Sequence, residues 1–381
     1  MDFRDLGAQY RALKPQIDAQ IQAVIDSHGF ILGKQVTELE KRLADYVGMK
    51  HCVTCASGTD ALLLPLLAWG IGPGDAVFVP DFTYFATANC PMLRGATVVL
   101  VDIDERTFNM SPVALEKTIE RVLKEGKLTP KVICPVDLFG QPADYPEICK
   151  IAKKYNLKIL EDGAQGFGGH IGEKIACSFG DVGATSFFPA KPLGCYGDGG
   201  AMFTNDDVMA DALKSLRASG RSPEDKYDNQ TMGLNSRLDT LQAGILMPKL
   251  QAFIDCELAD VNKVANKYTE LLKDIVVTPL VKEGFVSSWA QYTILLKDAA
   301  QRDGLKAYLQ TKGIPSMIYY PRGMHQQTAL KNAGMAGGDF ANTENIVQRC
   351  LALPMHPYMT DEQVKFVVTA VREFVNFKFK G

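Results

Sequence analysis

The chain has 381 residues, of which 46% are hydrophobic and 22% charged, and 41 Lys and Arg against 44 Asp and Glu residues give a net charge of −3. This composition excludes a disordered or fibrous protein, and the lack of a basic excess argues against nucleic-acid binding. At about 150 residues per domain, the length predicts one large domain and a smaller one.

The N-terminal residues are charged from the second position on and contain no apolar core of a signal peptide. Residues 61–72, the longest apolar run of helical type, contain Pro65 and Gly70 and fall short of the roughly 20 residues that a membrane span needs. The nine cysteines are scattered, and Cys52 and Cys55 lack the second ligand pair of a zinc site. We therefore expect a cytoplasmic protein with free thiols, no membrane contact and no metal.

In chain order, helical periodicity covers residues 8–28 and 35–47, and from residue 50 onward short apolar runs alternate with helical stretches. The apolar runs are rich in Val, Ile and Leu throughout, which is typical of strands buried on both faces. They lie at 77–80, 97–103, 131–140 and 157–162, and the helical stretches at 59–69, 83–94, 111–124 and 144–155. The alternation predicts a mainly parallel sheet with crossover helices.

The second half of the chain has a different pattern. Strand-like residues 184–188 and 201–205 flank a Gly-rich loop at 189–200, and a long helical region follows at 237–273. Beyond it we expect antiparallel strands within 275–297, a helix at 299–312, a strand near 315–320 and a helix at 361–376. This order predicts a large domain at 1–250 and a small α+β domain at 251–381, with the boundary inside the long helix.

Two residues near strand ends carry candidate chemistry. Asp162 ends the apolar run LKILED, and the carboxyl ends of parallel strands face the ligand crevice. Its carboxylate either caps the next turn or pairs with a cationic ring nitrogen. Lys191 lies among Phe, Pro, Leu and Gly residues, a setting that lowers the pKa of an amine and favours Schiff-base chemistry. The alternative is a loop lysine whose amine reaches solvent.

Two further features have open interpretations. Residues 56–61, ASGTDA, lead from a strand-like run into a helix, so the N–H groups there form either an anion site or an ordinary N-cap. Tyr84, just after the run VFVP, is either a stacking surface for a flat ring or a core aromatic. Together, the anion site, aromatic, acid and lysine meet the needs of one cofactor, pyridoxal phosphate.

The segments SGTDAL, FTYFATA, DLFGQPAD, EDGAQ, TSFFPAKPLGCYGDGGA and NSRLDTLQA resemble the nucleotide-sugar aminotransferases of the DegT–StrS group. The resemblance extends from FRDLGAQY and FILGKQV to YYPRGMH, over nearly the whole chain. It implies an α/β protein of the fold-type I pyridoxal-phosphate transferases: a mostly parallel, seven-stranded sheet between helices, with a smaller C-terminal α+β domain. The cofactor would be pyridoxal 5'-phosphate.

The resemblance also implies roles for single residues. Lys191 matches the Schiff-base lysine, where dehydratases of the group have His, and Asp162 matches the acid that pairs with the ring nitrogen. Gln165 matches the group beside the ring hydroxyl, and Tyr84 matches the stacking aromatic. Ser186, with the amides of Gly58 and Thr59, matches the phosphate ligands. Asn235 matches a residue that reaches the phosphate of the neighbouring subunit. Gly163, where the family often has Ala or Cys, removes a methyl group near the ring.

For the reaction, the resemblance implies amino transfer from L-glutamate to a nucleotide-linked keto-sugar by a homodimer with shared active sites. The branch most similar to this chain acts on UDP-linked 3-keto-N-acetylglucosaminuronate in surface polysaccharide biosynthesis, as in lipopolysaccharide O-antigen. Arg237 would pair with the uronate carboxylate or, alternatively, hold the dimer interface. Tyr320 and His325 would lie near the sugar, with Arg322 on the nucleotide side.

Other substrates and one other class of protein remain open from the sequence. The substrate alternatives are a 3-keto or 4-keto deoxyhexose on dTDP, UDP or GDP, and a keto-inositol. The other class is a non-catalytic regulator on the same fold, against which the presence of both Lys191 and Asp162 argues.

Overall fold

The computed structural model describes residues 1–222, 224–225, 227–335 and 337–378. The chain begins with α1 (Leu6–Ser27), where the Asp5 carboxylate accepts a hydrogen bond from the Ala8 N–H at 2.7 Å, and continues with α2 (Lys34–Val47). Both helices confirm the periodicity of the sequence, and the Asp5 cap satisfies one of the free N–H groups at the start of α1.

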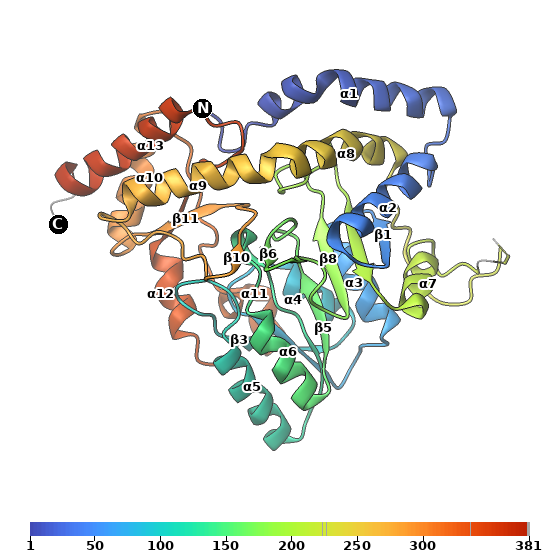
Figure 1. The fold of residues 1–381 in the computed structure, drawn as a ribbon. Coiled ribbons are helices and arrows are strands. Elements are labelled where there is room, and N and C mark those ends of the chain that lie inside the picture. The colour runs from blue at the N-terminus through green and yellow to red at the C-terminus, as the bar shows by residue number, and fades with distance from the viewer. Residues whose placement is uncertain (223, 226, 336, 379–381) are drawn as a thin grey trace.

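A seven-stranded sheet forms the centre of the molecule (Figure 1). Its spatial order is β1 (His51–Cys55), β9 (Gly200–Thr204), β8 (Val182–Ser186), β5 (Lys158–Asp162), β4 (Thr129–Ile133), β2 (Asp75–Pro80) and β3 (Thr97–Val101). The strands from β8 to β3 pair in parallel, and β9 runs antiparallel to both of its neighbours. The predicted mostly parallel α/β sheet is confirmed.

Helices cover both faces of the sheet, which explains why its strands are apolar at successive positions. In β2, Val77 and Val79 pack on one face and Ala76 and Phe78 on the other, and all four are buried. The first face is covered by α3 (Gly58–Ala68), α4 (Ala86–Leu93) and α7 (Asp207–Leu216), the second by α5 (Pro112–Glu125) and α6 (Tyr145–Tyr155). The sequence expected β4 to extend to residue 140, but it ends at Ile133, and a 3-10 turn forms at Leu138–Gly140.

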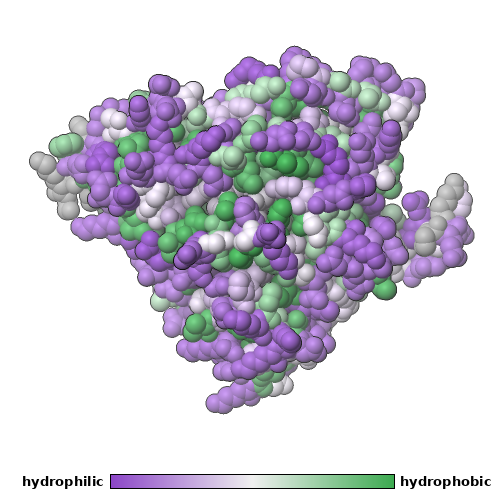
Figure 2. Space-filling model, viewed as in Figure 1, coloured by the Kyte–Doolittle hydropathy of each residue, from purple (hydrophilic) through white to green (hydrophobic). Residues whose placement is uncertain are grey.

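One long helical rod crosses the molecule, as predicted for residues 237–273. It consists of α8 (Thr240–Ala252), a π-helical turn at Phe253–Glu257 and α9 (Leu258–Leu272). Figure 1 shows the rod running from the side of α2 to the C-terminal elements, with α1 above α8. On the face shown in Figure 2, polar residues dominate the rim and apolar residues gather in patches nearer the middle.

The C-terminal part has its own apolar core, in which α9, α10 (Ala299–Thr311) and α13 (Asp361–Glu373) pack around paired strands β11 (Tyr292–Leu295) and β12 (Cys350–Leu353). Its remaining elements are α11 (Thr328–Asn332), α12 (Ala341–Arg349) and the turns Met324–Gln326 and Phe374–Lys378. This core agrees with a small α+β unit, while the boundary near residue 250 stays a prediction.

One expectation for this part was wrong. Residues 315–320 form no strand, because only Met317 bridges to Ala352. The expected antiparallel strands within 275–297 are confirmed: β11 pairs with β12, Val277 bridges to Leu295, and β10 (Phe285–Val286) adds to the sheet of β6 (His170–Ile171) and β7 (Lys174–Ile175). Within the described ranges, every helix is too short or too polar to span a bilayer.

Candidate active site

The polar candidates meet at a cavity of about 360 Å³ beside the sheet. Asp162 ends β5, Ser186 ends β8, Lys191 lies on the loop after β8, and Gly58 and Thr59 begin α3. The cavity therefore opens at the carboxyl ends of parallel strands, as expected of an open α/β sheet. Its other lining residues are Ser57, Leu62, Thr83, Tyr84, Ala86, Val136, Ala164, Gln165, Phe188, Ala190, Asp198, Gln291, Tyr319 and Tyr320.

Asp162 and Lys191 both line this cavity, and their charges interact. The Asp162 carboxylate accepts hydrogen bonds from the Thr87 hydroxyl at 2.8 Å and the Ala164 N–H at 3.2 Å. Burial raises the pKa of Asp162, and these two bonds and the charge of Lys191 oppose that rise. Burial lowers the pKa of Lys191 to about 8, against the charge of Asp162. The amine is thus enclosed and partly neutral near neutral pH, which a loop lysine exposed to solvent is not.

The start of α3 supplies unpaired N–H groups. The Ser57 hydroxyl accepts from the Asp60 N–H at 3.1 Å and caps the helix, and the N–H groups of Gly58 and Thr59, which have no partner inside the helix, remain for a ligand. A Cβ at position 58 would lie 2.6 Å from the Ser186 Cβ. Glycine is therefore required for the helix start to approach the Ser186 hydroxyl, and the two together form a cup for an anion.

Gln165, Tyr84 and Tyr320 also line the cavity. The Gln165 side chain donates to the Tyr320 hydroxyl at 3.0 Å and accepts from the Phe139 N–H at 2.8 Å, which fixes its orientation. Tyr84 is 58% exposed, and its ring centroid lies 6.4 Å from that of Tyr320. Tyr84 is therefore no core residue, and an aromatic face is available to a flat ligand.

Asn235 and Arg237 do not line this cavity. Between them, the fully buried Ser236 donates to the Asp60 carboxylate at 2.6 Å and accepts from the Ala56 N–H at 3.1 Å. The segment is thus anchored at the base of α3 by Ser236, while Asn235 is exposed and Arg237 half-buried. The predicted roles of Asn235 and Arg237 therefore do not concern the cavity of their own chain.

His325 and Arg322 also lie outside the lining. The His325 Nδ1 is 2.6 Å from one oxygen of the buried Asp81 carboxylate, and the backbone N–H of His325 donates to the other oxygen at 2.7 Å. The His325 ring stacks on that of Phe340 with centroids 4.8 Å apart. His325 therefore fastens the segment after Tyr320 to the end of β2. Arg322 is exposed.

Sequence reasoning missed three residues of the site. Thr87 bonds Asp162 and lies inside the quoted segment FTYFATA, so its position in that motif was a usable signal. Tyr319 and Gln291 enter the cavity from the C-terminal part; Tyr319 lies inside the quoted segment YYPRGMH, while no local pattern marks Gln291.

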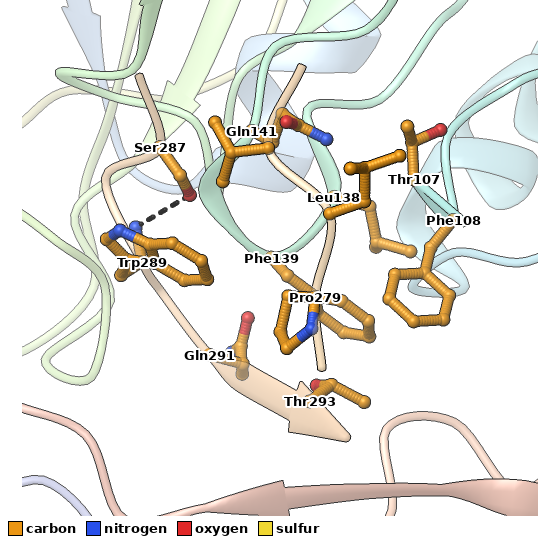
Figure 3. A pocket seen from close by; sticks show the side chains of 12 residues that line it. Thr107, Phe108, Leu138, Phe139, Gln141, Pro279, Ser287, Trp289, Gln291 and Thr293 are labelled. Carbon is orange, nitrogen blue, oxygen red and sulfur yellow. Dashed lines mark hydrogen bonds between the residues drawn. The ribbon is translucent and has the colours of Figure 1, made fainter. Parts of the chain in front are cut away.

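Gln291 also borders a second, small cavity of about 20 Å³ (Figure 3). The Oε1 atom of Gln291 and the Oγ1 atom of Thr293 are buried without a hydrogen-bond partner among the described residues. A space of this size with two polar groups accommodates about one water molecule. Such a water would fix the Gln291 amide at the edge of the larger cavity.

Glu161, next to Asp162, has a structural role. Its buried carboxylate accepts from the N–H groups of Cys177, Phe179 at 2.7 Å and Gly180 at 3.3 Å, and burial raises its pKa to about 7. A Cβ at Gly163 would lie 2.5 Å from the Cys177 Sγ. The glycine therefore makes room for Cys177, and the expectation that it removes a methyl group beside a ring is corrected.

The chemistry of these groups fits pyridoxal phosphate. The cavity contains an amine of lowered pKa, a buried carboxylate, an anion cup and an exposed aromatic ring, which are the groups that an aldehyde, a ring nitrogen, a phosphate and a pyridine ring require. In the part of the chain that the structure describes, no three His, Cys, Asp or Glu side chains cluster as metal ligands. Cys52 and Cys55 are free and buried in β1.

Comparison with known proteins agrees with this geometry. The model of the DegT/DnrJ/EryC1/StrS aminotransferase family matches residues 11–372. The UDP-2-acetamido-2-deoxy-3-oxo-D-glucuronate aminotransferase of Pseudomonas aeruginosa is 44% identical over 97% of this chain and 99% of its own length. A DegT/DnrJ/EryC1/StrS aminotransferase from Brucella abortus superposes with a TM-score of 0.96 at 48% identity, covering 99% of this chain and 100% of that one. The ntda protein of Bacillus subtilis, solved with bound cofactor PMP, superposes with a TM-score of 0.85 at 27% identity, covering 95% of this chain and 81% of that one.

Proposed function

The chain belongs to the DegT/DnrJ/EryC1/StrS aminotransferase family, and we propose that it transfers the amino group of L-glutamate to UDP-linked 3-keto-N-acetylglucosaminuronate. It is a pyridoxal-phosphate enzyme that acts on nucleotide sugars. The observation that carries the proposal is the meeting of the Lys191 amine and the Asp162 carboxylate in one cavity with an anion cup. The 44% identity to the Pseudomonas enzyme supports the choice of sugar.

In the proposed binding mode, each part of the cofactor has a partner in this chain. The N–H groups of Gly58 and Thr59 and the Ser186 hydroxyl bind the phosphate, since a helix start favours an anion. Tyr84 covers one face of the ring. Gln165 lies beside the ring hydroxyl with its amide oriented by two hydrogen bonds.

When bound, pyridoxal phosphate supplies an electron sink for the charge that develops as the Cα–H bond of an amino acid breaks. The Lys191 amine removes that proton from Cα and returns a proton at C4′, which a pKa of about 8 allows near neutral pH. The Asp162 carboxylate holds a proton on the ring nitrogen. Because Thr87 and Ala164 fix its two oxygens, this ion pair needs no reorganisation during the reaction.

We propose a homodimer in which each cavity is completed by the other copy. Lys191 is the only cation among the described residues that line the cavity, whereas a phosphate and the carboxylates of both substrates require several positive groups. Asn235 and Arg237 do not line their own cavity and lie on a segment anchored by Ser236. In the proposed dimer, Asn235 of the partner subunit reaches the phosphate and Arg237 of the partner subunit pairs with the uronate carboxylate.

We further propose a cytoplasmic enzyme of surface polysaccharide biosynthesis, as in lipopolysaccharide O-antigen. The nine cysteines are free thiols, of which seven are buried, Cys149 is half-buried and Cys256 is exposed. Free thiols are typical of a reducing compartment. An amino group on a uronate sugar is a component of such polymers, and the Pseudomonas relative acts on that sugar class by its name. Tyr320 of the cavity and the nearby Arg322 and His325 are proposed to lie on the sugar and nucleotide side.

The test is a substrate panel with purified, cofactor-loaded protein. UDP-3-keto-N-acetylglucosaminuronate, the matching neutral UDP-3-keto-N-acetylglucosamine, and 3-keto or 4-keto deoxyhexoses on dTDP are each supplied with L-glutamate, and 2-oxoglutarate is measured. The proposal expects the highest kcat/KM for the uronate and no turnover by Lys191→Ala. Faster turnover of a neutral or dTDP-linked sugar would assign that sugar instead, and a lack of turnover with every keto-sugar would favour a regulator.

A further inference from the structure

The guanidinium of Arg4 lies against the loop that carries Lys191. Its Nη2 donates a hydrogen bond to the Lys191 carbonyl oxygen at 3.0 Å, between residues 187 positions apart in the sequence. The Nη1 atom is buried and has no acceptor among the described residues. Arg4 belongs to neither of the two N-terminal helices, since α1 begins at Leu6 after the Asp5 cap. The contact is therefore a feature of the short segment that precedes the first helix.

This N-terminal segment, residues 3–5, also contacts the opposite wall of the cavity. The Phe3 carbonyl accepts from the Met355 N–H at 3.1 Å, and the Phe3 ring meets that of Tyr319 edge-on with centroids 6.2 Å apart. Tyr319 lines the cavity. The segment thus joins the backbone of Lys191 to the C-terminal part that forms the sugar side.

Arg4 brings a positive charge close to the Lys191 loop. Burial lowers the pKa of Arg4 to about 10, against the charge of Glu257, so the guanidinium stays protonated at neutral pH. The Glu257 carboxylate is itself bound by the Gln9 amide at 2.9 Å and the Tyr358 hydroxyl at 2.6 Å. The charged groups that act on the Lys191 amine are Asp162, which favours the ammonium, and Arg4, which disfavours it; Asp198 lines the same cavity.

We propose that Arg4 is a positioning residue for the reaction: it fixes the backbone of Lys191 through the carbonyl and holds a cation beside that loop. The proposal rests on the assignment of Lys191 in the proposed function. The Lys191 side chain must move between the cofactor and the substrate while its backbone stays in place, and the loop's own bond from the Lys191 N–H to the Phe188 carbonyl at 2.9 Å holds the backbone only on the N-terminal side of this residue. Arg4 holds the other side.

The experiment separates the hydrogen bond from the charge. Arg4→Gln keeps an amide donor without charge, and Arg4→Lys keeps the charge without the planar guanidinium. Arg11→Gln, which removes a 71% exposed arginine of α1 that lies 3.9 Å from the Asp5 carboxylate, is the control for loss of a charge near the same segment. On the cofactor-free chain, competitive acetic-anhydride labelling across pH, read by mass spectrometry of the Lys191 peptide, gives the pKa of that one amine. The rate of appearance of the visible absorbance band with added pyridoxal phosphate gives cofactor uptake.

For Arg4→Gln we expect the labelling midpoint of Lys191 to move upward from about 8, and uptake at pH 7.5 to slow about tenfold, the effect of one charge-assisted hydrogen bond. Arg4→Lys should hold the midpoint and slow uptake less, and Arg11→Gln should change neither. An Arg4→Gln chain equal to the control in both measurements overturns the proposal. If Arg4→Gln does not fold, the Arg4→Lys chain provides the test. A raised labelling midpoint of Lys191 in this chain, which retains the positive charge, would contradict the role of Arg4.

The two proposals fail in distinguishable ways. If the unaltered chain forms no absorbance band with pyridoxal phosphate, the proposed function fails. If it forms the band, Lys191→Ala abolishes it and the Arg4 variants behave as the control, then only the role of Arg4 is lost.

Discussion

The two sides of the cavity differ in how completely one chain builds them. The cofactor wall consists of Gly58, Thr59, Asp162, Ser186 and Lys191, and the sugar side of Gln291, Tyr319 and Tyr320. The cofactor wall comes from neighbouring strand ends and one helix start, and its acid is held by two hydrogen bonds. The sugar side comes from the C-terminal part and has no cation of its own among the described lining residues.

This difference separates chemistry from specificity. Strand ends of one sheet have a fixed spacing, so a single chain can pre-orient the groups that break and form bonds. Recognition of a charged sugar needs a second set of groups, and the exposed Asn235 and the half-buried Arg237 do not line the cavity of their own chain. Substitutions in the cofactor wall should therefore affect every substrate, and substitutions of the segment 235–237 should discriminate between sugars.

The largest effect is expected for Lys191→Ala. Loss of the amine removes the proton-transfer group, so kcat should fall at least about 10³-fold with every keto-sugar. The visible absorbance band with pyridoxal phosphate should also disappear, while circular dichroism and the melting temperature stay close to those of the unaltered chain. An activity within a few fold of the original would remove Lys191 from the mechanism.

Asp162→Asn should lower kcat by about 10²–10³-fold, because the fixed negative charge that stabilises the protonated ring nitrogen is lost. The same change should move the labelling midpoint of Lys191 below about 8, since the charge of Asp162 favours the ammonium form. These two shifts are measured by single-turnover kinetics and by peptide-level labelling across pH. An unchanged midpoint would mean that the acid and the amine do not interact.

Arg237→Ala should raise KM for a uronate sugar by about a hundredfold, the cost of losing one partner of a buried charge pair, and leave KM for the neutral sugar nearly unchanged. The measurement is KM for UDP-3-keto-N-acetylglucosaminuronate and for its neutral analogue with the same protein. Equal losses with both sugars would indicate that Arg237 supports the dimer interface instead.

Mixing Lys191→Ala with Arg237→Ala, assayed with the uronate sugar at a concentration too low for the Arg237→Ala chain to turn over, tests whether that arginine acts across subunits. In randomly re-formed dimers of Lys191→Ala and Arg237→Ala chains, half of the dimers contain one intact site, so about a quarter of the unaltered activity should return. Mixtures of Lys191→Ala with Asp162→Asn are the control. Both altered groups line the cavity of their own chain, so each site of a mixed dimer keeps one altered group and no activity should return. Recovery is read as 2-oxoglutarate formed per total protein after dilution and reconcentration.

Much of the cofactor wall could be predicted because it lies where local patterns are strong. The apolar strands and the residues at their ends are adjacent in sequence, and sheet geometry brings the ends together. The sugar side could not be found in this way. Gln291 and Tyr319 enter the cavity through the packing of the C-terminal part, and Arg4 contacts Lys191 across 187 positions. His325 pairs with Asp81, a partner 244 positions away that no motif indicated.

The smallest effect on catalysis is expected for Gly163→Ala, which tests how tightly the cofactor wall is packed. The added Cβ would lie 2.5 Å from the Cys177 Sγ, so unfolding free energy should fall by about 1–3 kcal/mol, as in overpacked cores. The methyl group points at Cys177, so kcat should stay within a few fold. Removing the sulfur in Gly163→Ala/Cys177→Ala should restore part of the stability, because the two positions are coupled. Gly72→Ala, whose Cβ would meet no atom closer than 3.6 Å, is the control and should be neutral in urea denaturation. If Gly163→Ala equals this control, the wall has space to spare, and its rigidity cannot explain the contrast with the sugar side.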